Sequence, residues 1–502
     1  MDFNQDFIRN FPFFSIMLSM FAGIVSSVLP GRAAKWVNRA VIAVVGVLSL
    51  VLLLYLLGTG ESYVYMMGHF PAPWGNEIRA GVLEAGMALF FCIIMLLSML
   101  GGAHKLLTEV AEEKQNLYYI LVNLLLSSLL ALVYTNDIFT AYVFVEINTI
   151  TACGLIMIRE TGRTIEAAVR YMIMSLLGSG LLLMGLCVLY DLTGHLLMSN
   201  MREQVAYLVE NHLYSMPLLV TIGLISSGLA IKSALFPFHA WLPDAYGYST
   251  ASSAAMLSSL VSKGYIFLLI KLIYRVFGFE VFHDSHIVNV LFVFGLMGMI
   301  FGSLSAIREN DIRRMVAFSS VAQIGYIFMG IGMGTQVAMV ASVFHILSHA
   351  ATKSLLFISA VGLTDVSGGS RKFEDLTGAG YRDPCAGVAF TAGALSMVGV
   401  PLFSGFISKL LFAQAAVQNS GKMLPALIVL GISTILNAIY FMKTVIRLYT
   451  PVGAASESGG HPGKSRWLYV ATLIGFIVLN IVLGVNSQPI VDMIGQGLGM
   501  FA

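Results

Sequence analysis

Four lysines lie within long apolar stretches of the sequence, a setting that disfavours an ammonium group. They are Lys232, Lys263, Lys353 and Lys409. An ionisable group at membrane depth is costly when it faces lipid, so such groups face the protein interior, pair with each other or line water, and they mark ion paths. Glu146 lies in the middle of "AYVFVEINTITACG" in the same manner. These five residues are candidates for proton transfer, and a purely structural ion pair is the alternative.

Two histidines extend this pattern. The stretch "FHILSHAATKSLLF" places His345, His349 and Lys353 at successive i+4 steps, so all three lie along one face of a helix. Groups stacked about 6 Å apart suit a proton relay, because histidine exchanges protons near physiological pH. A His-x-x-x-His pair can also bind a metal, but here no Glu follows the first His and no third ligand is evident nearby. Helix packing alone is the remaining alternative.

Helix-breaking residues lie beside two of the lysines. Pro237 follows Lys232 in "IKSALFPFHAWLPDA", and Pro401 and Gly405 precede Lys409 in "GVPLFSGFISKLLF". Proline interrupts a helix, and an interruption at membrane depth is tolerated only where protein or trapped water satisfies the freed backbone groups. We therefore expect two broken helices, each next to a buried lysine.

The composition fixes the environment of these groups. Of 502 residues, 58% are hydrophobic and 11% are charged, against roughly 25% charged in soluble domains. A membrane-spanning helix needs about 20 apolar residues, which predicts an all-α polytopic membrane protein with about 14 transmembrane helices. These spans lie near residues 13–30, 36–58, 81–100, 116–135, 138–158, 171–191, 217–236, 253–275, 288–307, 312–334, 338–362, 386–411, 424–448 and 467–485. Glu84 lies near the end of the third span, where it is either functional or an interfacial anchor.

The charges in the loops test this count. The loops that follow the odd-numbered spans carry eighteen Lys and Arg residues. The loops that follow the even-numbered spans, together with both termini, carry six. The positive-inside rule then places both termini outside the cytoplasm. The pattern is compatible with a prokaryotic cytoplasmic (inner) membrane. The acidic start "MDFNQDFIRNF" lacks the cationic region of a signal peptide, so we expect the first helix to be retained.

The positions of the breaks suggest internal repeats. Lys232 belongs to the fourth helix of spans 4–8, and Lys409 belongs to the fourth helix of spans 9–13. Since five is an odd number, two such units must be inverted relative to each other, as in many ion transporters. We therefore predict N-terminal helices in 1–115, one repeat in 116–277, an inverted repeat in 288–448, and a last helix with a tail in 449–502. Span 10 offers no carboxylate to match Glu146.

Several classes of function are disfavoured. The net charge is +2 and the basic residues form no run, which argues against nucleic-acid binding. No C-x-x-C pair occurs among the four cysteines, so we expect no iron–sulfur cluster and no other cofactor in this chain. The four cysteines are Cys92, Cys153, Cys187 and Cys385.

Several of these stretches resemble the signature blocks of one family. "YTNDIFTAYVFVEI", "IKSALFPFHAWLPDAY", "SSLVSKGYIFLLIKL", "FHILSHAATKSLLF" and "GVPLFSGFISK" are similar to blocks of the antiporter-like proton-conducting subunits shared by respiratory complex I, Mrp cation/proton antiporters and energy-converting membrane-bound hydrogenases. The resemblance covers residues 115 to 450. It implies fourteen helices, two inverted five-helix repeats and a central chain of protonatable residues.

The resemblance also implies residue roles. Glu146 and Lys232 match the family's glutamate and its partner lysine, and Lys409 matches the terminal residue of the second half-channel. The matching connecting and relay groups are His239, Lys263, His345, His349 and Lys353.

The resemblance leaves the parent complex open. One complex I subtype has a glutamate where Lys409 stands, and another has a long lateral helix for which the tail here is too short. The family's "LPDAH" is "LPDAY" here, so a role for a histidine does not carry over to Tyr246. A D-type Mrp subunit, its hydrogenase counterpart and a lysine-bearing complex I subunit remain. Each implies further membrane subunits, other antiporter-like chains among them, with H⁺ and possibly Na⁺ as the ion. A stand-alone transporter of an organic substrate is the alternative, disfavoured because the buried charges form a line and not one pocket.

Overall fold

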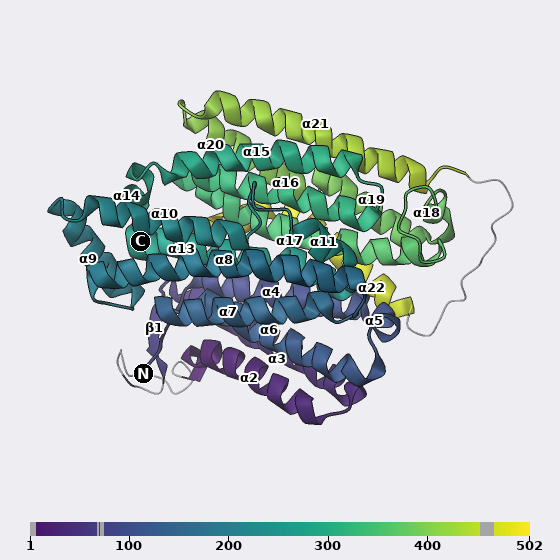
Figure 1. The fold of residues 1–502 in the computed structure, drawn as a ribbon, viewed down its shortest axis with the longest axis horizontal. Coiled ribbons are helices and arrows are strands. Elements are labelled where there is room, and N and C mark those ends of the chain that lie inside the picture. The colour runs from purple at the N-terminus through teal and green to yellow at the C-terminus, as the bar shows by residue number, and fades with distance from the viewer. Residues whose placement is uncertain (1–6, 68–69, 71–74, 452–465, 502) are drawn as a thin grey trace.

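The chain folds as a bundle of long helices that run nearly side by side (Figure 1). The computed structural model describes residues 7–67, 70, 75–451 and 466–501. Thirteen helical segments of this part are long and apolar enough to cross a membrane. They are α2 (Phe11–Val28), α3 (Gly31–Thr59), α4 (Val82–Gly101), η2 (Glu112–Lys114) with α6 (Gln115–Tyr134), α7 (Ile138–Met157), α8 (Gly162–Thr193), α10 (Ser215–Lys232), the segment Ala251–Phe277, α15 (Ile287–Arg308), α16 (Ile312–Met333), α17 (Gln336–Asp365), α21 (Met423–Leu448) and α22 (Arg466–Val485).

The remaining predicted span is a pair of shorter helices. The segment predicted near 386–411 consists of α19 (Pro384–Val398) and α20 (Ser404–Gln418), separated at Gly399, which has φ of +93°. In the same way α10 ends at Lys232, and α11 (Leu242–Tyr248) follows after an irregular stretch. Both predicted breaks are confirmed. The fourteen predicted spans thus correspond to thirteen long segments and one broken pair.

One span is irregular where the sequence predicted a plain helix. Ala251–Phe277 consists of α12 (Ala251–Met256), the π-turn η3 (Leu257–Val261), α13 (Ser262–Leu272) and the π-turn η4 (Ile273–Phe277). π-turns shift the helical register and occur often at functional sites. Neither π-turn contains a proline or a glycine, although Gly278 directly follows the second one.

Short elements lie at the two ends of the bundle. They are α5 (Ala103–Glu109), α9 (Met198–Glu210), α14 (Phe279–Asp284), α18 (Ala379–Arg382), α23 (Ser487–Gly499) and the antiparallel strands β1 (Tyr63–Met66) and β2 (Glu77–Ala80). The hairpin joins both ends of the described chain. The Tyr63 hydroxyl donates to the Arg9 carbonyl at 3.0 Å, and the Arg79 guanidinium donates to the Met500 carbonyl at 2.9 Å. Both ends therefore lie on one side, as an even number of crossings requires.

The centre of the bundle is formed by helices that carry four of the eight predicted site residues. The membrane-crossing stretches of Ala251–Phe277 and α17 are wholly buried, and the stretch of α16 is nearly so. By contrast, the corresponding stretches of α3, α21 and α22 are buried over about a third of their residues. Charged groups on the central helices are thereby kept away from lipid. The two inverted repeats and their boundaries stay a prediction.

Two glycines set the distance between α8 and α10 beside Lys232. A Cβ added at Gly178 would lie 2.9 Å from the Gly228 carbonyl oxygen and 3.0 Å from Cγ of Lys232. A Cβ at Gly228 would lie 2.6 Å from the Gly178 carbonyl oxygen. Both contacts are shorter than van der Waals distance, so the helices approach this closely only because neither residue has a side chain.

We predict that Gly178→Ala destabilises the protein by about 1–3 kcal/mol, because the added methyl group forces α8 away from α10. Thermal unfolding of the purified protein, followed by tryptophan fluorescence, measures the loss. Gly180→Ala is the matched control, since it changes the same helix two residues away, where an added Cβ meets nothing within 4 Å. Equal melting temperatures for the two variants would contradict the close approach.

Candidate functional site

The predicted pair of α7 and α10 forms in the structure. Nζ of Lys232 lies 3.5 Å from Oε1 of Glu146. The lysine is the last residue of α10 and its side chain is wholly buried, whereas the Glu146 side chain is 25% exposed. The Ser179 hydroxyl of α8 donates a hydrogen bond to the same carboxylate oxygen. The pair therefore joins one buried group to one that reaches the protein surface.

Uncharged side chains surround Lys232, and the sequence did not reveal them. Its ammonium donates to the Thr149 hydroxyl at 2.8 Å and lies 5.5 Å from the centroid of the Tyr265 ring. The Tyr265 hydroxyl is 3.3 Å from that of Thr149 and donates to Oδ1 of Asn148 at 3.0 Å. Thr149 follows Glu146 by three residues, and this i, i+3 spacing was the available signal.

Lys263 and Lys353 use main-chain oxygens. Lys263 follows the first π-turn, and its ammonium donates to the Ser258 carbonyl of that turn at 2.5 Å. Lys353 of α17 donates to the Val316 carbonyl of α16 at 2.8 Å and also to the Ser319 hydroxyl. Both side chains are wholly buried. In the described part of the chain, neither lysine is within ion-pair distance of a carboxylate.

The two histidines of α17 stack as the spacing predicted. Their ring centroids are 5.9 Å apart and the planes differ by 8°. Nδ1 of His345 is 2.6 Å from the Ser408 hydroxyl of α20, whereas Nε2 of His345 and both nitrogens of His349 are buried with no hydrogen-bond partner among the described residues. His349 interacts electrostatically with both Lys263 and Lys353. These four side chains therefore form one group at the centre of the bundle.

A metal ion bound by His345 and His349 would need a third protein ligand. Within the described ranges, no His, Cys, Asp or Glu completes a group of three that could hold a metal ion.

Lys409 is held by the break in front of it. Its ammonium donates to the carbonyls of Met397 and Val398 at 3.0 and 2.6 Å, which are the last carbonyls of α19. It also lies 6.0 Å from the centroid of the Tyr326 ring, and that ring stacks on His345. An ammonium at the C-terminal end of a helix is favoured by the helix dipole.

His239 lies apart from the other predicted residues. It follows the break after α10, and its ring stacks on Phe236 with centroids 5.2 Å apart. No side-chain hydrogen bond or ion pair in the described structure joins His239 to the other seven. The structure thus joins Lys232 to Glu146, and it places Lys263 and Lys353 around the stacked histidines, with Lys409 near His345 across the Tyr326 ring. It shows no contact between His239 and these residues.

A second buried charge cluster was missed. Glu84 of α4 is wholly buried and forms an ion pair with Arg275 of the second π-turn, so it is not exposed as an interfacial anchor would be. Next to it, Lys271 is also wholly buried and donates to the carbonyls of Leu132, Val133 and Thr135 at 3.2, 2.8 and 2.7 Å, near the end of α6. Lys271 and Arg275 are among the six Lys and Arg residues that the loop count assigned to the side of the two termini.

The chain is similar to proteins of a known family. A family profile described as NADH:quinone oxidoreductase/Mrp antiporter, transmembrane, matches residues 135–436. The chain is 33% identical over 450 residues to NADH-quinone oxidoreductase subunit N of Desulforudis audaxviator, covering 87% of each protein. It is 25% identical over 429 residues to the D-type subunit of a Na(+)/H(+) antiporter of Alkalihalophilus pseudofirmus, covering 85% of this chain and 84% of that one.

Solved structures share the whole fold. A chain of the membrane-bound sulfane sulfur reductase, an archaeal respiratory membrane complex, matches with a TM-score of 0.86 at 26% identity, over 98% of this chain and 97% of that one. A chain of the Mrp complex from Dietzia has the same TM-score and coverage at 24% identity.

We predict that Thr149→Val lowers proton transport by about tenfold or more, because a hydrogen bond to a charged group contributes about 1.5–3 kcal/mol and the buried ammonium would lose it. Proton uptake by liposomes that contain the purified parent complex measures the rate. Thr151→Val is the control, since the Thr151 hydroxyl bonds only to carbonyls of its own helix. A Thr149→Val complex that transports as fast as the control would exclude a role for this contact.

Proposed function

The chain belongs to the NADH:quinone oxidoreductase/Mrp antiporter transmembrane family, and from this premise we propose that it translocates protons along its buried Glu, Lys and His side chains. It is an antiporter-like subunit of an Mrp or complex I-type membrane complex. The observation that carries the proposal is the buried contact of Lys232 with Glu146. A separate group of buried lysines and histidines in the same bundle adds to it. A stand-alone transporter of an organic substrate is not supported by these relatives.

The first step depends on the charge state of one carboxylate. Burial in an apolar bundle disfavours the protonated ammonium of Lys232, and an ionised Glu146 favours it. While the carboxylate is ionised and 3.5 Å away, the lysine keeps its proton. When Glu146 moves away or is neutralised, the proton passes on. Since the Glu146 side chain is partly exposed, a charge on a neighbouring subunit can act on it.

The onward path uses the central group and ends at Lys409. From Lys232 the proton passes to Lys263, then through His345, His349 and Lys353. The stacked imidazoles with free nitrogens support transfer along α17, and the bond of His345 to Ser408 connects the relay to the helix of Lys409. His239 lies outside this group.

We propose a redox-driven pump as the parent complex. The support is the 33% identity to a quinone oxidoreductase subunit and the structural match to an archaeal respiratory complex. Electron carriers then belong to partner chains, and none is expected here. An Mrp-type sodium/proton antiporter is the second candidate, favoured by the similarity to the D-type antiporter chain. The membrane is a prokaryotic cytoplasmic membrane with both chain ends outside the cytoplasm, as the loop charges indicate.

We predict that Glu146→Gln abolishes proton transport while the complex still assembles, because the variant keeps the shape of the side chain and removes the charge that holds the proton on Lys232. Lys232→Ala, which removes the proton carrier itself, should have the same effect. Transport is measured in liposomes with the purified complex, and assembly by native gel electrophoresis.

Glu166→Gln is the control, since its 62% exposed side chain pairs with Arg170 at the protein surface. Loss of assembly in the Glu146 and Lys232 variants, with normal transport by any complex that forms, would favour a structural ion pair.

Purification of the tagged chain from its native membrane in mild detergent, followed by mass spectrometry, decides between the two complexes. Hydrogenase or dehydrogenase subunits in the sample would establish the redox pump. Small membrane proteins alone would establish the antiporter.

A further inference from the structure

Three arginines from three different segments converge on the end of α11. Arg159 follows α7, Arg313 lies in the first turn of α16, and Arg371 follows α17. The guanidinium groups of Arg371, Arg159 and Arg313 donate to the carbonyls of three consecutive residues, 247, 248 and 249, at 2.8, 2.9 and 2.7 Å. These carbonyls terminate α11, the short helix that follows the first break. Cations are favoured at this end of a helix. Each arginine uses one N–H group for this contact, and its other N–H groups can donate to a further partner.

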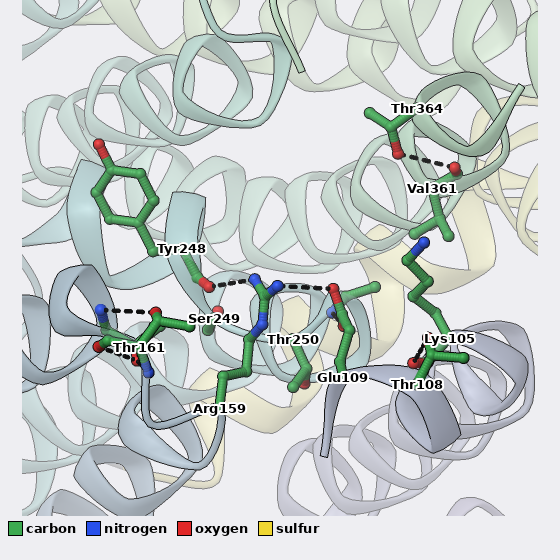
Figure 2. A network of polar contacts seen from close by, with 12 residues as sticks. Lys105, Thr108, Glu109, Arg159, Thr161, Tyr248, Ser249, Thr250, Val361 and Thr364 are labelled. Carbon is green, nitrogen blue, oxygen red and sulfur yellow. Dashed lines mark hydrogen bonds and ion pairs between the residues drawn. The ribbon is translucent and has the colours of Figure 1, made fainter. Parts of the chain in front are cut away.

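Beside these arginines lies a cavity of about 250 Å³, called here the basic cavity. Four cations line it, Lys105, Arg159, Arg313 and Arg371, against one carboxylate, Glu109. Figure 2 shows the Arg159 guanidinium between the Tyr248 carbonyl and Glu109, with Lys105 on the other side of the carboxylate. All of these residues come from the loops that the charge count assigns to the cytoplasmic side.

The positive charge in the basic cavity is not balanced. Lys105 pairs with Asp365, and Arg159 lies 3.6 Å from Glu109. Arg313 and Arg371 form no ion pair in the part of the chain that the structure describes. Arg313 is 3% exposed, and its Nε is buried with no hydrogen-bond partner.

Arg371, which follows α17, is half-buried. Burial is the main cause that lowers the pKa of its guanidinium, and Asp311 partly opposes this. The buried Nε of Arg313 is a donor without a partner, which costs free energy, so the site favours an acceptor that the described chain does not supply.

We propose that the basic cavity binds a phosphate group. A phosphate offers several acceptor oxygens, and arginine binds them in paired hydrogen bonds. Two sources share this chemistry, the headgroup of an anionic phospholipid and inorganic phosphate. The headgroup is available because anionic lipids line the cytoplasmic surface and attract basic segments. A larger groove of about 1080 Å³ shares Arg159, Gly369 and Arg371 with the basic cavity. A bound phosphate would connect the segment after α7, the start of α16 and the segment after α17 with α11.

The test uses the purified parent complex and its Arg371→Gln variant. After exhaustive detergent exchange, equilibrium binding of radiolabelled orthophosphate is measured, together with phospholipid retained in native mass spectrometry. We expect the wild-type complex to retain one anionic phospholipid or to bind one orthophosphate in this chain. In the variant the apparent Kd should rise about tenfold or more, since a charge-assisted bond is lost.

Lys105→Gln is a second variant, chosen because its side chain is 29% exposed and keeps a polar group beside Asp365 after the substitution. Arg308→Gln is the control. Arg308 ends α15 on the same side of the protein, is exposed and does not line the basic cavity.

The outcomes separate the two sources. A retained phospholipid that blocks orthophosphate, and that Arg371→Gln and Lys105→Gln release, identifies the headgroup. Orthophosphate bound with no lipid present identifies free phosphate. Binding that is equal in the wild type and in all three variants, or absent from the wild type, would overturn the proposal and leave the cavity to water.

Discussion

An ammonium group buried among apolar helices must be surrounded by oxygen atoms, and helix ends are where main-chain oxygens are free. Lys409 accordingly lies at the end of α19, against the carbonyls of Met397 and Val398. Lys271 lies at the end of α6 in the same way, against three carbonyls. Helix ends therefore supply the oxygen atoms for these two cations, at a break for Lys409 and at an ordinary terminus for Lys271. Lys263 and Lys353 bind carbonyls within helical segments instead.

The partners of the lysines also differ in a way that matters for proton transfer. Lys263 and Lys353 contact only neutral oxygens, such as the Ser258 and Val316 carbonyls. When either lysine releases its proton, no buried anion is therefore left without a partner. Lys232 alone among the lysines of the relay contacts a carboxylate in the described chain. Since a carboxylate can gain or lose charge and a carbonyl cannot, Lys232 is the site of the proposed relay at which a change of charge acts directly on the bound proton.

How far the sequence predicted this arrangement depends on where each interaction is encoded. Charges within apolar stretches and prolines beside them are local signals, and both breaks and the stacking of His345 on His349 follow from them. The π-turn before Lys263 has no such signal, because a shift in helical register arises from packing against other helices. The pairing of Glu84 with Arg275 joins residues 191 positions apart, so no window of sequence reveals it. Main-chain oxygens are equally hidden, because every residue type carries one.

The broken segment around Lys232 is held very differently at its two ends. On one side of the irregular stretch, α11 is bound by five arginines, three at its terminal carbonyls and two, Arg170 and Arg314, at Asp244. On the other side, the ammonium of Lys232 is held by one hydroxyl and one carboxylate. Moving the ammonium away from its partners therefore breaks one ion pair and one hydrogen bond, whereas α11 moves only if several guanidinium contacts are lost together.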